Sequence, residues 1–123
     1  IDLEGSFSAT RGENLTDNSP LYYVPPDKIL LSTEIYLSPF SINLMHKKVF
    51  SQNRVGLYEE TTPGYETYNL IGTYTIRSEQ AIHKFILQID NIFDRKYYNH
   101  LSRIKSIMPE KGRNIGFQYR LNF

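Results

Sequence analysis

The chain has 123 residues, of which 40% are apolar and 22% charged, and its formal net charge is +1. This near-neutral balance leaves no basic footprint for nucleic acid, so we expect no nucleic-acid partner. The absence of cysteine excludes disulfides and thiol chemistry. The sequence also contains no run of about 18 apolar residues, the length that a transmembrane helix needs.

Six segments alternate apolar and polar residues and therefore predict β-strands, because successive side chains of a strand point to opposite faces. In chain order they cover 1–9, 29–37, 41–51, 65–76, 84–92 and 113–123. Each has nine to twelve residues, about the length with which a tilted strand crosses a bilayer. Because the first segment alternates from its first residue, we expect the chain to be a piece of something longer.

The last segment has the clearest alternation, with one wholly apolar and one polar face. In a membrane barrel the apolar face contacts lipid and the polar face lines the lumen. The predicted lipid-facing residues are Ile115, Phe117, Tyr119, Leu121 and Phe123. The predicted lumen-facing residues are Asn114, Gln118, Arg120 and Asn122.

The predicted connections alternate in length, with long loops near 10–28, 52–64 and 93–112 and short turns near 38–40 and 77–83. Long loops are uncommon in compact domains, whereas outer-membrane barrels have long extracellular loops and short periplasmic turns. The pattern predicts an all-β fold, an antiparallel up-and-down meander of about six strands. His46, beside two lysines in the third segment, either faces the lumen or marks where that strand leaves the membrane.

Several motifs resemble the late barrel of TonB-dependent outer-membrane receptors. RGENL at 11–15, PL at 20–21 and VPP at 24–26 resemble that family's "RGxNL…PL…PP" run. ETTPGY at 60–65 and DNIFDRKY at 90–97 resemble its "E…TPGY" and "xNLFDKxY" segments. HLSR at 100–103 and PEKGRNI at 109–115 resemble the "HLSR…PExGRNI" that precedes the final strand. The terminal Phe123 is similar to the aromatic end by which such barrels are recognised for assembly.

This resemblance implies that residues 1–123 are the C-terminal fragment of a twenty-two-stranded transmembrane β-barrel, with the plug domain absent. It implies a receptor in the outer membrane of a Gram-negative bacterium that takes up a scarce nutrient: siderophore, haem, cobalamin, metal or glycan. The implied partners are outer-membrane lipid, the rest of the barrel and plug, the TonB protein through that plug, the barrel-assembly machinery, and a small-molecule or metal-chelate ligand. No cofactor is implied.

The long loops supply the candidate ligand contacts, which are Tyr22, Tyr23, Tyr58, Tyr97, Tyr98, Asn99 and His100. For the tyrosines the alternative is an aromatic girdle at the membrane boundary, and for His100 it is a role in folding the last loop. Motif residues are expected to be structural, since arginine can hold loops by forked hydrogen bonds and glycine permits positive φ or close backbone approach. They are Arg11, Gly12, Pro25, Pro26, Pro63, Gly64, Tyr65, Asn91, Phe93, Asp94, Arg103, Gly112 and Arg113.

Enzymatic chemistry is not expected. Glu59 with Glu60, and Asp90 with Asp94, are carboxylate pairs without a nucleophile or an organised partner. The alternative to a membrane receptor is a soluble β-sandwich module that binds glycan or peptide through tyrosine-lined loops, with the polar faces of its strands in solvent.

Overall fold

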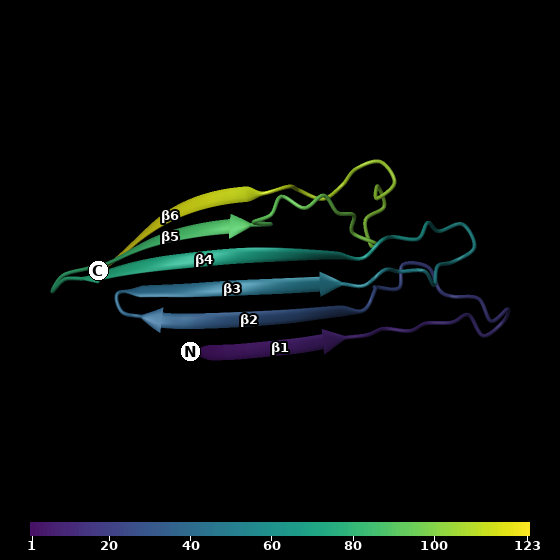
Figure 1. Cartoon of the computed structure of the whole chain (residues 1–123), viewed down its shortest axis with the longest axis horizontal. Helices are drawn as coiled ribbons and strands as arrows, with labels where there is room; N and C mark the ends of the chain where they lie inside the picture. Colours follow the sequence, from purple (N-terminus) through teal and green to yellow (C-terminus); the bar gives the residue numbers. More distant parts are fainter.

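The computed structural model describes all residues from 1 to 123, which form six β-strands. These are β1 (Asp2–Ser8), β2 (Lys28–Leu37), β3 (Phe40–Val49), β4 (Tyr65–Arg77), β5 (Ile82–Asp90) and β6 (Asn114–Asn122). They make one antiparallel sheet whose strand order follows the sequence (Figure 1). The predicted all-β meander of six strands is confirmed. The chain contains no helix that is long and apolar enough to cross a membrane.

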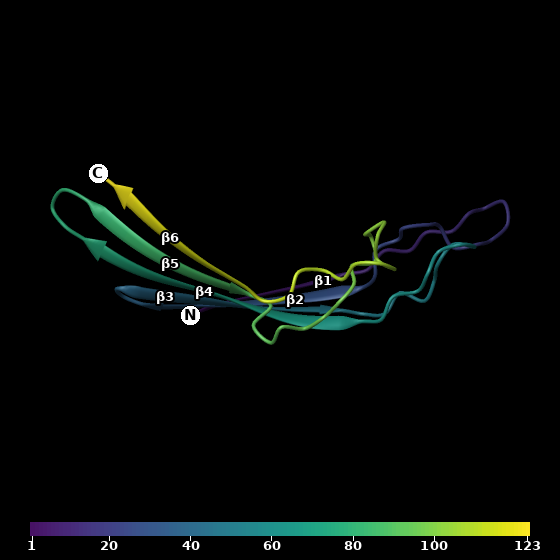
Figure 2. The same cartoon turned by 90° about the horizontal axis from the view of Figure 1, so that it is seen from above.

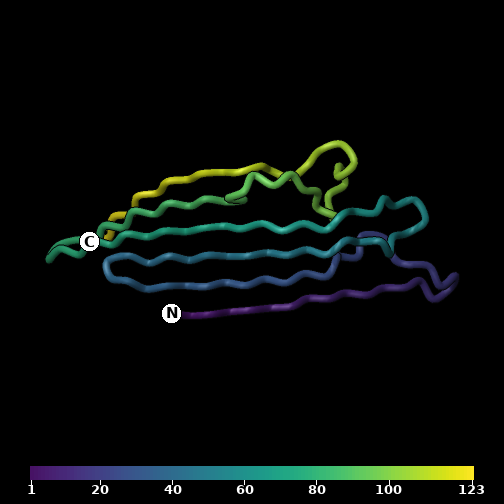
Figure 3. The backbone as a smooth tube through the Cα atoms, viewed as in Figure 1, coloured from purple at the N-terminus to yellow at the C-terminus, as the bar shows by residue number.

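The long and the short connections lie at opposite ends of the sheet (Figure 3). Residues 38–39 and 78–81 form the two short turns, at the end where both termini also lie. The connections 9–27, 50–64 and 91–113 lie at the other end, which we call the loop end. The predicted alternation of long and short connections is therefore confirmed.

The limits of β5 differ from the prediction for local reasons. The strand begins two residues earlier than predicted, because Ser78 and Ala81 close a tight turn with backbone and side-chain hydrogen bonds of 2.9–3.1 Å. His83 therefore lies in the strand and not in a turn. The strand ends two residues early because Asn91 has a φ of 51°, in the left-handed region that does not continue a strand.

The strand register divides the side chains between two faces, since residues directly opposite in an antiparallel pair point to the same side. Phe117 of β6 lies opposite Leu87 of β5, which lies opposite Gly72 of β4, which lies opposite Ile42 of β3. The side of the sheet that these residues share, here called the apolar face, also carries Leu3, Phe7, Ile29, Leu31, Ile35, Leu37, Leu44, Leu70, Ile76, Ile89, Ile115 and Leu121. Its polar exceptions are Thr33, His46, Lys48, Glu66 and His83.

The other side of the sheet, the polar face, carries most of the charged and amide side chains of the strands. They include Glu4, Ser32, Glu34, Asn43, Lys47, Thr67, Asn69, Thr73, Lys84, Gln88, Asp90, Asn114, Gln118, Arg120 and Asn122. A smaller apolar set shares this face, namely Leu30, Tyr36, Met45, Val49, Tyr65, Ile71, Ile82 and Ile86. The alternation predicted for the last strand is thus continued across the whole sheet.

An aromatic row crosses the apolar face near the short-turn end. Phe40, Tyr74, Phe85 and Tyr119 stand opposite one another in successive pairs from β3 to β6. Their ring centroids are 4.7, 6.3 and 5.1 Å apart in that order, and the Tyr119 hydroxyl lies 2.7 Å from Nδ1 of His83. Aromatic side chains at one height across adjacent strands are typical of a girdle at a membrane–water boundary.

The sheet is a single curved layer (Figure 2). Only 8 of 123 residues are buried, and just two of them, Val49 and Tyr65, are hydrophobic core residues. Side chains of the apolar face stay open, with Leu3 80% and Phe117 70% exposed. A β-sandwich packs two sheets face to face. The structure contains one sheet, and the second layer that the sandwich alternative needs is not formed by these residues.

Candidate functional site

The segment that follows β5 is folded by the buried Asn91. Its backbone N–H donates to Oδ1 of Asn69 at 2.9 Å, and its own Oδ1 accepts from the N–H of Arg95 at 2.9 Å. Its Nδ2 donates to the Arg95 carbonyl, also at 2.9 Å. Asn91 and Asp94 both have positive φ, 51° and 53°, which short polar side chains tolerate better than others. The motif thus turns the chain sharply out of the sheet.

Asp94 then fixes the approach to β6. Its Oδ1 accepts a hydrogen bond of 2.7 Å from the backbone N–H of Arg113, whose guanidinium makes no hydrogen bond or ion pair. Gly112 lies against the same carboxylate, where an added Cβ would come 2.6 Å from Oδ1. A Cβ at Gly64 would come 2.8 Å from the Val49 carbonyl oxygen. Neither glycine has positive φ; at Gly64 the close neighbours are backbone atoms, which leave no room for a side chain, whereas at Gly112 the close neighbour is the end of the Asp94 side chain.

Two arginines tie the first long connection. Arg11 Nη1 and Nη2 donate to Oδ1 and Oδ2 of Asp27 at 2.5 and 2.7 Å, the forked arrangement expected of Arg11. These hydrogen bonds lower the pKa of Asp27, while desolvation opposes the shift. Arg54, which the sequence did not single out, pairs with Glu13 and so joins the second connection to the first.

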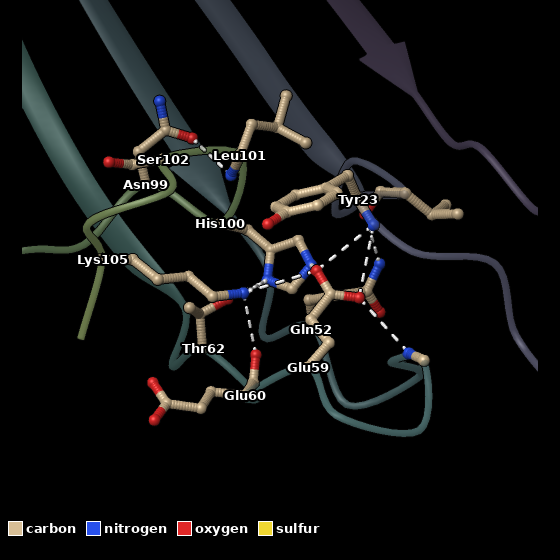
Figure 4. A network of polar contacts seen from close by, with 12 residues as sticks. Tyr23, Gln52, Glu59, Glu60, Thr62, Asn99, His100, Leu101, Ser102 and Lys105 are labelled. Carbon is tan, nitrogen blue, oxygen red and sulfur yellow. Dashed lines mark hydrogen bonds and ion pairs between the residues drawn. The ribbon is translucent and has the colours of Figure 1, made fainter.

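A buried polar cluster, here called the loop network, joins all three long connections (Figure 4). Oε1 of Glu59 lies 3.0 Å from Nε2 of His100 and 3.4 Å from Nζ of Lys105. The backbone N–H groups of Tyr23 and Gly56 donate to the same carboxylate at 3.2 and 3.3 Å. The side chains of His100 and Glu59 are only 1% and 5% exposed, so water does not screen these contacts.

The contacts of His100 fix its tautomer. Its Nδ1 lies 2.8 Å from Oγ1 of Thr62 and 3.2 Å from Nζ of Lys105. Because an ammonium group can only donate, Nδ1 accepts, and the ring proton is on Nε2, which faces Glu59. That N–H is poorly aligned for a hydrogen bond, so the contact with Glu59 is electrostatic. Burial, with a smaller effect from Lys105, lowers the pKa of His100 against the opposing effect of Glu59.

Glu59 is held in its charged form. Burial raises its pKa, but the hydrogen bonds from Gly56 and Tyr23 and the nearby His100 and Lys105 lower it more, so the net pKa is below the ordinary value. The network therefore contains one carboxylate, one ammonium and a neutral imidazole. Buried ion pairs of this kind add little stability over an apolar cluster, but they are costly to break. The contacts of this network hold the three long connections together.

A polar cavity of about 300 Å³ opens on the polar face at the loop end. Its polar lining comes from β3 to β6 and the third connection: Lys47, Thr67, Asn69, Asp90, Asn91, Tyr97, Glu110, Lys111 and Asn114. The ring of Tyr97 stacks on Tyr65 at 4.3 Å. Burial, aided by Glu110 and Asp90, raises the pKa of Tyr97, so its phenol stays neutral. The lining mixes hydrogen-bond donors with acceptors and cations with carboxylates, which suits a polar ligand with several hydroxyl or carboxylate groups.

The predicted loop contacts differ widely in exposure. Tyr58 is 89% exposed, and Tyr22 and Tyr23 are 51% and 50% exposed. Tyr98 is half-buried, with the Lys96 ammonium 5.9 Å from its ring centroid. His100 belongs to the loop network and is 2% exposed. Asn99 accepts a 3.1 Å hydrogen bond from the Leu101 N–H. Of this set only Tyr97 lines the polar cavity. Ligand contact by these seven residues stays a prediction.

The remaining motif residues lie at the loop end without a shared site. Gly12 accepts a 3.2 Å backbone hydrogen bond from Leu21, and Pro25 and Pro26 are half-buried whereas Pro63 is exposed. Phe93 is 73% exposed, and its ring lies nearly perpendicular to that of Tyr68, with the centroids 5.3 Å apart. Arg103 is exposed, and its side chain makes no hydrogen bond or ion pair. Their structural roles stay predictions.

Comparison with known proteins adds a likeness in fold. No family model matches the chain. Among solved structures, the copper transporter OprC is similar to 95% of this chain, with a TM-score of 0.83 and 21% sequence identity. The chain spans 20% of the length of that transporter. At this level of identity the likeness shows that the two share the arrangement of the six strands.

Proposed function

We propose that the chain is the C-terminal part of the transmembrane β-barrel of a TonB-dependent receptor. The observation that carries the proposal is that one face of the sheet is apolar and uncovered while the other is polar. A wall between lipid and an aqueous lumen satisfies both faces at once. The motif resemblance and the likeness in fold to a transporter support the same conclusion.

In this proposal the outer membrane of a Gram-negative bacterium surrounds the apolar face. The aromatic row from Phe40 to Tyr119 is the periplasmic girdle, because short turns of such barrels lie on the periplasmic side. The loop end is then extracellular. The odd-numbered residues of β6 contact lipid, and Asn114, Gln118, Arg120 and Asn122 face the lumen.

The edges of the sheet define the partners that the proposal needs. β1 and β6 each pair on one side only, and an unpaired strand edge leaves backbone groups unsatisfied in a membrane. We assign these edges to further strands of a twenty-two-stranded barrel, which the barrel-assembly machinery closes after recognising Phe123. A plug domain in that barrel would receive energy from the TonB protein.

The proposed activity is energised uptake of a scarce nutrient, a siderophore, haem, cobalamin, metal or glycan. The polar cavity beside Tyr97 supports a role in contacting such a small molecule or metal chelate, since it opens on the lumen side directly below the long connections. We assign the exposed Tyr22 and Tyr58 to contact with the ligand from outside.

Uptake in the producing bacterium tests this function. Cells with and without the gene are compared for uptake of labelled ferric siderophore, haem, cobalamin, copper and an oligosaccharide, each with and without a protonophore. We expect deletion to abolish uptake of at least one of these, and the protonophore to abolish the same uptake in cells that keep the gene. Uptake of all five that is unchanged by deletion, or a gene-dependent uptake that resists the protonophore, would contradict the proposal.

A further inference from the structure

A second cavity, of about 510 Å³, lies at the loop end on the apolar side of the sheet. Lys48 and Glu66, which line it, stand opposite each other in β3 and β4 and share the apolar face with the pair Leu44 and Leu70. The third connection closes its side with Phe93 and Arg95. The cavity therefore sits where the apolar band ends and the long connections begin.

The cavity carries an uncompensated positive charge. Nζ of Lys48 lies 2.9 Å from Oε1 of Glu66, and the second oxygen of Glu66 lies 3.5 Å from Nε2 of His46. Arg95 has no such partner: its backbone N–H is held by Asn91, but its guanidinium makes no hydrogen bond or ion pair. Two permanent cations and one carboxylate thus line the cavity, and the free cation is the one with fork geometry suited to phosphate.

Exposed aromatic rings surround these charges. Phe93 is 73% and Phe50 40% exposed, and the Lys48 ammonium lies 5.7 Å from the Phe50 ring centroid. The Tyr68 ring stacks on His46 with centroids 4.5 Å apart and forms a T-shaped pair with Phe93 at 5.3 Å. Aromatic rings beside basic side chains are the arrangement that membrane interfaces favour.

Below the charges lies the pair His46–Tyr68, and beyond that pair the apolar face continues as an open track. The pair Leu44–Leu70 is followed by the pair Ile42–Gly72. Nothing lies within 4 Å of the position that a Cβ of Gly72 would take. The track therefore has room for a hydrocarbon chain that descends from the cavity along β3 and β4.

We propose that this cavity binds a phosphorylated lipid of the leaflet on the loop side, with the phosphate on Arg95 and Lys48 and an acyl chain along Leu44, Leu70 and Gly72. The site rests on the proposed function, because it needs the apolar face to contact lipid. Positive charge above an apolar track selects for a ligand that is anionic at one end and hydrocarbon at the other. Free phosphate would use the cations alone.

The test uses the whole protein purified in a non-ionic detergent and dioleoylphosphatidate as the probe, with bound lipid counted by native mass spectrometry. Arg95→Gln removes a charge that holds nothing else in place. We expect it to weaken phosphatidate binding about tenfold, the effect of about one lost charge-assisted hydrogen bond. Arg103→Gln, an exposed arginine of the same connection that does not line the cavity, is the matched control and should bind like the wild type.

Three results would overturn the lipid site: equal binding by Arg95→Gln and wild type, equal binding of dioleoylglycerol, or displacement of phosphatidate by equimolar inorganic phosphate. A second measurement shows whether the lipid site alone has failed or the proposed function as well. It uses a fluorophore attached to the Phe117→Cys variant, on a background without other cysteines. Quenching by brominated lipid places the apolar face in lipid, so any of the three results then rejects the site alone. If quenching is absent, both proposals fall.

Discussion

In the sheet, 46 of the 61 backbone–backbone hydrogen bonds join neighbouring strands, while side chains on both faces stay open. At the loop end, in contrast, side chains are buried. The eight buried residues all lie in or next to it, namely Val49, Gln52, Gly56, Thr62, Tyr65, Thr67, Asn91 and His100. The loop end thus contains its own interior, whereas the sheet relies on its surroundings to satisfy its faces. The following substitutions test that difference.

The largest effect is expected where a charge enters the apolar face. Phe117→Arg, in the middle of β6, should lower the free energy of unfolding by about 2–4 kcal/mol, the cost of a cation near the bilayer midplane. Gln118→Arg, on the polar face one residue away, should cost little. Denaturant titration of the whole protein in phospholipid vesicles measures both. Similar losses at the two positions would contradict the assignment of the faces.

The loop network should be the next most sensitive. Glu59→Gln leaves Lys105 buried without its carboxylate and weakens the hydrogen bonds from Tyr23 and Gly56. We expect a loss of about 1–3 kcal/mol in the free energy of local opening, seen as faster amide hydrogen exchange at Tyr23 and Gly56. Glu60→Gln is the control, because only the backbone carbonyl of Glu60 contacts the network. Equal exchange in both variants would show that the Glu59 carboxylate does not hold the connections together.

A smaller loss is expected at Asn91. Asn91→Ala removes both side-chain hydrogen bonds to Arg95 and places a Cβ-bearing apolar residue at a φ of 51°. The expected loss in the free energy of unfolding is about 1–2 kcal/mol. Asn91→Gly removes the same hydrogen bonds, but glycine adopts positive φ without strain. It should therefore lower the free energy of unfolding by less than Asn91→Ala does. If glycine proves the worse replacement, the positive φ is not a source of the cost.

Acidification should open the loop network gradually. The pKa of His100 in the folded protein is below its ordinary 6.5, so unfolded chains bind the proton first. The contribution of His100 to stability is therefore complete above pH 6.5 and is lost as the pH falls toward the lowered pKa. Glu59, whose pKa lies below 4.5, adds a second loss below that pH. Exchange at the Gly56 amide, corrected for its intrinsic pH dependence, should follow this course.

His100→Gln provides the control for the acid response. It should abolish the loss that begins near pH 6.5 and keep the loss that begins near pH 4.5. An unchanged pH profile in this variant would mean that another group, and not His100, controls the opening.

Much of the sheet was predictable because alternation is a local property of the sequence. The pattern from Ile115 to Leu121 identified one face, and the register then assigned the other strands to it. The ends of β5 were misplaced because they depend on the tight turn at Ser78 and the positive φ of Asn91, which periodicity does not encode.

The loop network could not be predicted in the same way. The sequence indicates a ligand contact or a loop-folding role for His100, and it presents Glu59 only as half of a carboxylate pair. Their meeting depends on how two connections fold, with Lys105 and Glu59 separated by 46 positions in the sequence. Arg54 and Glu13 are 41 positions apart, and no local signal links them. The polar cavity likewise depends on the register that brings Lys47 and Asn69 beside the third connection.

Spin labels placed singly at positions 114–121 of the protein in its own outer membrane test the central claim most directly. Collisions with oxygen, which concentrates in lipid, are compared with collisions with a water-soluble nickel chelate. We predict that labels at 115, 117, 119 and 121 favour oxygen and that labels at 114, 116, 118 and 120 shift toward the chelate, with a period of two residues. Labels at the odd positions that favour the chelate, or the absence of alternation, would contradict a wall between lipid and lumen.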